Sequence, residues 1–368
     1  MKIVDVIVQC YRYPAPPLRG TQFGTQEEAT LVRVIADNGL EGYGVARAVG
    51  GSSGRIVADG VLNTAKPRVV GEDAFQRERI WQKLWALDRG NHLQIFATSV
   101  IDVALWDLAG KALNAPVWQL LGGYRNKLPA YASSARLASV DDYVAEALQC
   151  RARGYTAYKL HPFADPAKDV AVCRAVREAV GPDMKLMLDA SCEYDHEAAL
   201  RVGREIEKLN FHWYEEPINA YDLRGYTELS RALEIPVVAA EMVPGSIRST
   251  AQYILQNAGD ILRADVYWRG GITALMKTAH LCEANGIKTE LHHGASPLMD
   301  IATLHCACAI KNCEFLELLV PEPRYEFGLK DYSALHIDAE GNVHAPPGPG
   351  LGVTIDWDFI DRHTTFSG

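Results

Sequence analysis

The spacing of hydrophobic and polar residues changes character twice along the first third of the chain. From residue 1 to about 49 apolar and polar positions alternate, as in KIVDVIVQCYRY and ATLVRVIADNGLEGYGVA, with a turn signal at 37–39. This alternation predicts an antiparallel meander. From about 56 to 121 the apolar spacing becomes helical, notably in FQRERIWQKLWAL. Together the two stretches predict an α+β unit over residues 1–125.

The rest of the chain alternates short strand-like runs with helical stretches. Between Leu128 and Val320 the runs are LPAYASS, AYKLH, KLMLDAS, HWYEEP, PVVAAE, ILRADV, KTELHH and FLELLV. Eight such repeats predict a parallel (β/α) barrel of the TIM type over residues 126–320, and therefore an α/β protein with an α+β capping domain. The Pro- and Gly-rich segment 321–368 is expected to pack back on the capping domain. An open doubly wound sheet is the main alternative, but no GxGxxG follows an early strand.

Composition excludes several classes of function. The chain has 368 residues, of which 48% are hydrophobic and 23% charged, with a formal net charge of -9 and no block of like charge. A nucleic-acid partner or an anionic membrane surface would require a basic stripe, so neither is expected. The 8 cysteines form no CxxC pair. With no signal-peptide pattern and no apolar run of about 20 residues, the sequence predicts a reduced, cytoplasmic protein.

Titratable residues are concentrated where the proposed strands end, which is the edge that carries the active site in (β/α) barrels. Asp189, Glu215 and Glu241 follow one another at intervals of 26 residues (215 − 189 and 241 − 215), so each lies one βα step from the next. Three carboxylates at close range stay ionised only with a cation between them. Oxygen ligands with open positions favour Mg²⁺ or Mn²⁺ over Zn²⁺. Three unrelated helix caps or salt bridges are the alternative.

Candidate bases flank these acids. Lys159 and His161 are two residues apart on a strand and therefore face the same side, which is the barrel mouth if the residues between them face the helices. Asp265 closes the sixth strand and His292 the seventh. A carboxylate that accepts a hydrogen bond from one imidazole nitrogen orients the ring and raises its basicity. A salt-bridge lysine and a core histidine are the alternatives, but their pairing one step before the first acid favours catalysis.

This ordered set resembles the mandelate racemase subgroup of the enolase superfamily. The GYG at 42–44, the run SVIDVALWDLAGKALNAPVWQLLGG and the closing PGLGV also resemble that family, and the match covers essentially the whole chain. The resemblance implies a capping domain over a modified barrel, and Mg²⁺ chemistry with a Lys or His base on a small carboxylate substrate. A homo-oligomer is expected as well. The resemblance implies that Asp189, Glu215 and Glu241 are metal ligands and that Glu216 supports these ligands. It implies that Lys159 and His161 are bases on one face of the substrate, and that Asp265 and His292 form a dyad on the other face. It also implies that Glu317 donates a hydrogen bond to the substrate carboxylate.

One residue departs from the family's pattern. Where the family usually carries a second Lys, this chain has His161. The pKa of free His is about 6.5 and that of free Lys about 10.4, so a His in this place is ready to accept a proton near neutrality. The change keeps a base while shortening its reach.

The expected reaction begins with loss of the proton next to a carboxylate. Polar residues of the loop 13–26 (Arg19, Thr21 and Gln22), with Trp268 and Arg269 after the sixth strand, are candidate substrate contacts and favour a sugar acid. β-Elimination of water, by an acid-sugar dehydratase, is the first expectation. A racemase, epimerase or cycloisomerase is the second. The third, a non-catalytic protein that binds metal and carboxylate, is disfavoured by the intact base set.

Overall fold

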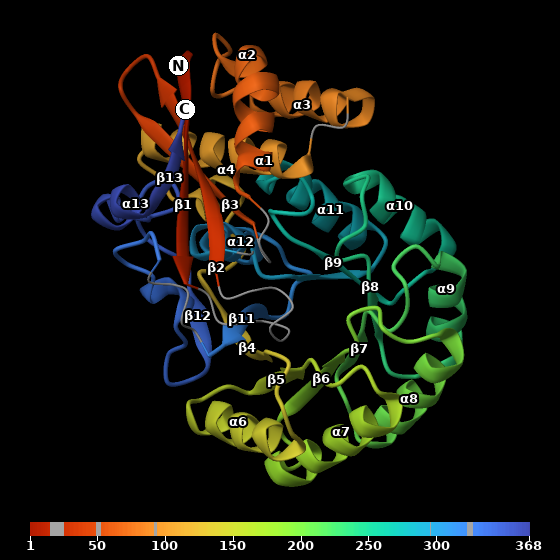
Figure 1. Cartoon of the computed structure of the whole chain (residues 1–368). Coiled ribbons are helices and arrows are strands. Elements are labelled where there is room, and N and C mark those ends of the chain that lie inside the picture. The colour runs from red at the N-terminus through yellow and green to blue at the C-terminus, as the bar shows by residue number, and fades with distance from the viewer. Residues whose placement is uncertain (15–25, 49–52, 92–93, 295, 322–326) are drawn as a thin grey trace.

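The computed structural model describes residues 1–14, 26–48, 53–91, 94–294, 296–321 and 327–368 (Figure 1). An antiparallel sheet and a set of helices, drawn mostly from red to orange, form a cap that packs against one side of a parallel barrel. Helices α6 to α10 surround the outside of the barrel. The predicted fold class is confirmed. Among the described residues, no helix has the length and apolar character needed to cross a membrane.

The cap is built on a four-stranded antiparallel sheet. Its order is β13-β1-β2-β3, and the bounds are β1 (Ile3–Pro14), β2 (Gln26–Ala36), β3 (Glu41–Ala48) and β13 (Thr364–Ser367). Alternate side chains of β1 are buried, as the meander pattern predicts. The cap helices are α1 (Arg55–Asp59), a π-helical turn (Gly60–Ala65), α2 (Lys66–Val69), α3 (Arg77–Asn91), α4 (Ile95–Ala112) and α5 (Val117–Leu120).

Helix α4 lies directly on strand β3, and two glycines permit this contact. A Cβ on Gly42 would lie 1.9 Å from the carbonyl oxygen of Ala104, and a Cβ on Gly44 would lie 2.1 Å from that of Val100. Both obstacles are backbone atoms, which cannot rotate away. The GYG motif therefore fixes the distance between the cap sheet and the helix that separates it from the barrel.

We expect Gly44→Ala to destabilise the protein by about 1–3 kcal/mol or more, because overpacking against a helix backbone forces main-chain shifts. Urea unfolding followed by circular dichroism would measure the change. Gly39→Ala is the control, since that Cβ would meet nothing within 4 Å and only its φ of +82° is strained. A Gly44→Ala protein no less stable than Gly39→Ala would contradict the role given to the motif.

The barrel consists of eight parallel strands, and pairing of β11 with β4 closes it. The strands are β4 (Lys127–Ser134), β5 (Ala157–Leu160), β6 (Lys185–Asp189), β7 (Trp213–Glu215), β8 (Val237–Ala239), β9 (Ile261–Ala264), β10 (Lys288–Leu291) and β11 (Leu316–Val320). Each predicted run contains one of them, except that β4 begins one residue before its run. The helices between them are α6 (Val140–Ala152), α7 (Pro166–Val180), α8 (His196–Lys208), α9 (Leu223–Ala232), α10 (Ile247–Gln256), α11 (Ile272–Ala284) and α12 (Pro297–Ala309).

Inward-facing side chains of the barrel form two layers. The lower layer, which we call the apolar floor, is a buried cluster of Tyr131, Ala157, Met187, Trp213, Val238, Ile261 and Phe315. Because side chains alternate along a strand, the residue two positions further on again points inward. On five strands that residue is charged and buried, and the set is Lys159, Asp189, Glu215, Arg263 and Glu317. A charged layer therefore lies on the apolar floor, toward the carboxyl ends of the strands.

The segment after Val320 contacts both parts of the molecule. Strand β12 (Asn342–His344) pairs antiparallel with the first residues of β4, whereas β13 pairs with β1 in the cap. Helix α13 (Trp357–His363) precedes β13, and a 3₁₀ turn (Ser333–Leu335) precedes β12. The boundaries 1–125, 126–320 and 321–368 stay predictions.

Candidate active site

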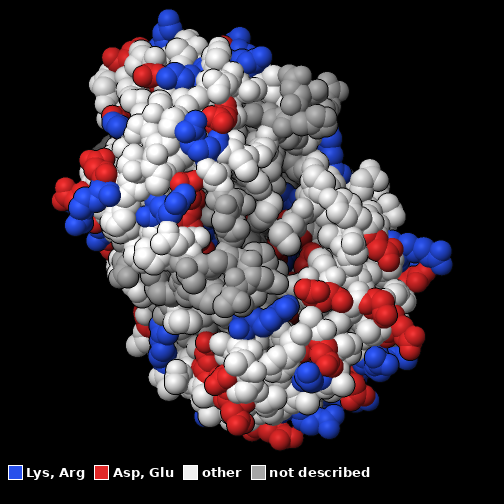
Figure 2. Space-filling view, in the orientation of Figure 1, with Lys and Arg blue, Asp and Glu red and all other residues white. Residues whose placement is uncertain are grey.

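The surface of the molecule shows a recess in the orientation of Figure 1 (Figure 2). Charged side chains are visible inside this recess, while acidic and basic groups are interspersed over the surrounding described surface. The charged layer lies at the carboxyl ends of the barrel strands, the edge at which enzymes of this architecture place their catalytic groups.

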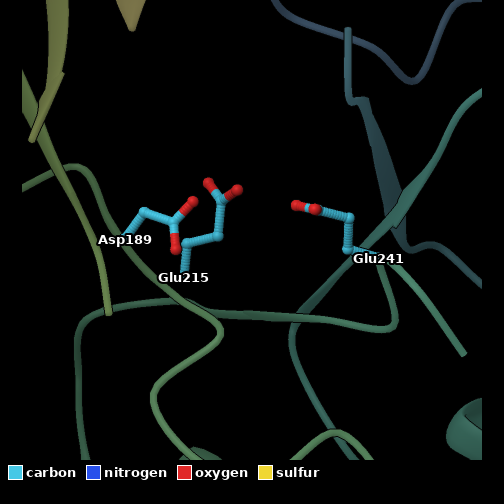
Figure 3. Close-up of side chains that lie close together, drawn as sticks. All are labelled: Asp189, Glu215 and Glu241. Carbon is cyan, nitrogen blue, oxygen red and sulfur yellow. The ribbon is translucent and has the colours of Figure 1, made fainter. Parts of the chain in front are cut away.

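Three carboxylates, which we call the carboxylate triad, meet at the mouth of the barrel. Asp189 ends β6, Glu215 ends β7 and Glu241 follows β8, and each offers an oxygen that lies within 4.8 Å of the oxygens of the other two. Figure 3 shows Glu241 pointing across the barrel toward Asp189 and Glu215. All three side chains are buried. The equal spacing in the sequence therefore corresponds to convergence in space.

Glu216 contacts the backbone of one member of this triad. Its φ of 43° lies in the left-handed region, so its side chain leaves the backbone in a different direction from that of Glu215. One of its oxygens accepts a hydrogen bond from the backbone N–H of Glu241 at 3.1 Å, and the other accepts one from the thiol of Cys192 at 3.0 Å. Burial, together with the charge of Glu241, raises the pKa of Glu216 to about 7. It holds the backbone of one ligand in place.

Lys159 lies in the centre of the charged layer. Its Nζ is 2.7 Å from Glu215, 2.9 Å from Glu317 and 3.4 Å from Asp189. The neighbouring Tyr158 points the opposite way and donates to Glu146 on α6, so the strand alternates as expected. Burial and Arg263 oppose the charged form, but the carboxylates of Glu215 and Glu317 raise the pKa of Lys159 well above its ordinary value.

His161 lies beside Lys159, next to the first acid of the triad. Its Nε2 is 2.8 Å from Oδ2 of Asp189. Two hydrogen bonds fix its backbone: its N–H donates to Ser134 Oγ at 3.1 Å, and its carbonyl accepts from the hydroxyl of Tyr143 at 2.6 Å. Its Nδ1 is buried and has no hydrogen-bond partner among the described residues. The imidazole is held at the triad by its backbone and by one ring nitrogen.

Asp265 and His292 form a dyad on the other side of the triad. Oδ2 of Asp265 is 2.7 Å from Nδ1 of His292, while its Oδ1 accepts from the backbone N–H groups of Tyr267 and Trp268. The other ring nitrogen of His292, Nε2, is 3.4 Å from Glu241. Burial opposes protonation, but Glu241 and Asp265 raise the pKa of His292 above its ordinary value. Histidines thus lie on both sides of the triad, one toward Asp189 and one toward Glu241.

Glu317, which was expected to donate a hydrogen bond, is an acceptor in the structure. Its two oxygens contact the ammonium of Lys159, the guanidinium of Arg263 and the backbone N–H of His293. Burial alone would raise the pKa of Glu317, but these cations hold it well below its ordinary value. A donor role requires a proton, which this arrangement disfavours.

The predicted substrate contacts have different outcomes. Arg19, Thr21 and Gln22 lie outside the described residues. The ring of Trp268 packs edge-on against Phe96 at the start of α4, with centroids 4.9 Å apart. Arg269 is buried and donates to the carbonyls of Val243 and Ala240, so it is a structural residue. Trp268 stays a predicted substrate contact.

Comparison with known proteins assigns the chain to a family. Residues 142–359 match the family described as "Enolase C-terminal domain-like", and residues 3–122 match "Mandelate racemase / muconate lactonizing enzyme, N-terminal domain". The chain belongs to the enolase superfamily. Within it, the mandelate racemase/muconate lactonizing enzyme subgroup is the one matched, which confirms the resemblance found in the sequence.

Relatives of this enolase-superfamily protein differ in their reactions. L-talarate/galactarate dehydratase of Salmonella typhimurium is 34% identical over 76% of the chain and 71% of its own length. A 3,6-anhydro-alpha-L-galactonate cycloisomerase of Streptomyces coelicolor is 31% identical over 98% and 99%. A solved D-glucarate dehydratase from Agrobacterium tumefaciens, complexed with magnesium, is 37% identical and covers 100% of both chains with a TM-score of 0.90. Racemases are also among the relatives.

The carboxylate triad of this superfamily member fits a divalent cation. With Glu317, the triad makes four buried carboxylates, and among the described residues Lys159 and Arg263 are fixed cations in contact with them, so two negative charges remain. Burial raises the pKa of Glu215 to about 8 against the opposing charges of Arg263 and Lys159, so a further cation is needed to keep this carboxylate ionised near neutrality. Oxygen donors alone suit a hard cation such as Mg²⁺.

Arg263 is the residue of this site that strand-end reasoning missed. It lies two positions before Asp265 in the run ILRADV and is completely buried. The signal was present, since period-two alternation places it on the same inward face as Asp265. An arginine inside a barrel strand must have buried acidic partners.

Proposed function

We propose that the protein removes the proton next to a substrate carboxylate in an Mg²⁺-dependent reaction and then eliminates water from a sugar acid. The observation that carries this proposal is the placing of base groups on two sides of a buried carboxylate triad. Lys159 and His161 lie toward Asp189, and His292 lies toward Glu241. A structural ion-pair network does not require histidines on both sides of the triad. Removal of a proton on one side of the substrate and delivery of a proton on the other require a titratable group on each side.

Each residue has a defined task in this mechanism. Asp189, Glu215 and Glu241 would hold the cation, which supplies positive potential to the substrate carboxylate when bound. His161 accepts the α-proton, because the carboxylates of Glu215 and Glu317 hold Lys159 in its protonated form, and the C–H electron pair moves into the enediolate. On the other side, His292 gives a proton to the β-hydroxyl as the C–O bond breaks, and water leaves. Asp265 keeps the ring of His292 in position. The enol product then tautomerises to a 2-keto-3-deoxy acid.

The same geometry favours racemisation or epimerisation as a second candidate. If His292 returns a proton to the α-carbon on the face opposite Lys159 and His161, configuration inverts and no water is lost. The relatives support both candidates, because they include dehydratases of sugar acids as well as a racemase of N-succinyl amino acids.

Metal removal provides the first test. We expect exhaustive treatment with EDTA to abolish turnover and Mg²⁺ or Mn²⁺ to restore it, because the triad stabilises developing negative charge only with its cation. Turnover would be followed by semicarbazide trapping of 2-keto acid. Protein that is dialysed in parallel without EDTA and then given the same metal is the control for losses in handling. Activity that survives chelation would contradict the assignment of the triad.

A product screen separates the two candidate reactions. We expect at least one hydroxylated acid from a library of sugar acids to give a semicarbazide-reactive 2-keto product. The screen is repeated in D₂O, with N-acylated amino acids added, so that proton exchange without elimination is detected by mass spectrometry. Inversion with deuterium uptake, and no keto product from any acid, would favour the racemase.

A further inference from the structure

Arg263 is held beneath the carboxylate triad by contacts in three directions. Its Nε lies 3.0 Å from Oε1 of Glu215 and 3.4 Å from Oε2 of Glu241, close enough for ion pairs although the N–H points at neither oxygen with hydrogen-bond geometry. One of its terminal nitrogens donates to Glu317, and the other donates to the hydroxyl of Tyr131 at 3.0 Å. The guanidinium therefore touches two triad members and one further acid.

A purely structural role would leave these contacts unexplained. A buried arginine needs one well-placed carboxylate to offset the cost of desolvation, and Glu317 would suffice. Arg263 instead extends from Glu317 to Glu215 and Glu241, which come from adjacent strands. The guanidinium is planar and always charged, so it can contact these three carboxylates at once, whereas a lysine ammonium is a single point charge.

We propose that Arg263 is a positioning residue of the metal site, which fixes Glu215 and Glu241 as ligands and sets the charge of the triad to suit a divalent cation. The inference rests on the metal dependence in the proposed function. The triad and Glu317 carry four negative charges and Lys159 and Arg263 carry two positive ones, so two negative charges remain, which a dication neutralises. Without Arg263 this set of four carboxylates and Lys159 would keep three negative charges, which a trivalent ion neutralises.

The choice of ion therefore tests the charge that Arg263 contributes. Arg263→Gln removes the charge, so we expect the ratio of Tb³⁺ to Mn²⁺ affinity to rise by about tenfold or more, since one additional unit of negative potential acts more strongly on the ion of higher charge. Loss of positioning weakens both ions alike and leaves this ratio unchanged. Tb³⁺ binding would be read from luminescence sensitised by Trp213, whose indole N–H donates to Glu215, and Mn²⁺ binding from electron paramagnetic resonance.

Two variants complete the test. Arg263→Lys keeps the charge but loses the fork, so we expect Mn²⁺ binding about 10- to 100-fold weaker with the Tb³⁺ to Mn²⁺ ratio of the parent. Tyr131→Phe removes a neutral partner of the guanidinium and should also keep the parental ratio. If Arg263→Gln does not fold, the Arg263→Lys protein carries the test, and parental Mn²⁺ affinity in it would overturn the inference.

An unchanged ratio in a folded Arg263→Gln protein would equally overturn the inference, as would a shift of the same size in Tyr131→Phe. Failure of the proposed function has a different signature. In that case the parent binds Mn²⁺ and Glu241→Gln does not, yet no acid in the library is turned over. The binding experiments need no substrate, so the two failures are distinguishable.

Discussion

Glu241→Gln is expected to eliminate detectable turnover while the protein stays folded. Glu241 is a triad member whose side chain forms ion pairs only with Arg263 and His292, each at 3.4 Å, among the described residues, so a neutral amide is accommodated there. Loss of cation binding removes several kcal/mol of transition-state stabilisation, which corresponds to about a 10³-fold lower rate or more. Steady-state turnover in saturating Mg²⁺, with far-UV circular dichroism for folding, measures the effect.

Glu241 is preferred to Glu215 for this experiment because Glu215 lies deeper. Glu215 is fully buried and bonds both Lys159 and the indole of Trp213, so its replacement would disturb the packing as well as the metal. Glu314→Gln is the matched control. Glu314 contacts Lys185 and Lys288, the first residues of β6 and β10, at the opposite end of the barrel. Near-parental turnover by Glu241→Gln would exclude the triad as the metal site.

His161→Asn is expected to lower turnover by about 10²- to 10⁴-fold, the usual contribution of a general acid or base. The amide side chain would keep a polar group near Asp189 but could not accept a proton. Metal affinity and stability should change little, because the backbone of this residue is held independently by Ser134 and Tyr143. Turnover of the identified substrate, together with Mn²⁺ titration, separates catalysis from binding.

Companion variants assign the faces of the substrate. His161→Lys restores a base and should recover part of the rate lost in His161→Asn. His292→Asn should still exchange the α-proton with D₂O while failing to expel hydroxide, if His292 acts as the acid on the other face. If His161→Asn stayed within a few-fold of the parent, Lys159 alone would be the base. His161 would then orient Asp189, with which it already shares a 2.8 Å contact.

The barrel could be predicted from sequence because its strands are short, apolar and separated by helices of regular spacing. In β5, for example, Tyr158 and Lys159 face opposite sides, and the structure confirms the direction of both. The triad could be predicted for a related reason. A spacing of 26 residues between successive acids is one βα step, and parallel strands bring the ends of such steps to one edge.

Other features depend on contacts between side chains of distant strands, which no local pattern contains. Glu317 was expected to donate a hydrogen bond, but its acceptor state depends on Lys159 and Arg263, from β5 and β9. Attention to strand ends alone also missed Arg263. The left-handed backbone of Glu216, which turns its side chain toward the backbone of Glu241, has no signature in the EEP motif.

The pairing of β13 with β1 has a consequence for the order in which the protein assembles during synthesis. Cys10 is opposite Phe366 in the cap sheet, so β1 pairs with a strand that is synthesised more than three hundred residues after it. Until then one side of β1 presents unpaired N–H and C=O groups, an edge that invites pairing between nascent chains. The barrel can close earlier, since β4 to β11 are all complete by Val320. We therefore expect chaperones that bind the growing chain to act on the unpaired edge of β1 more than on the strands of the barrel.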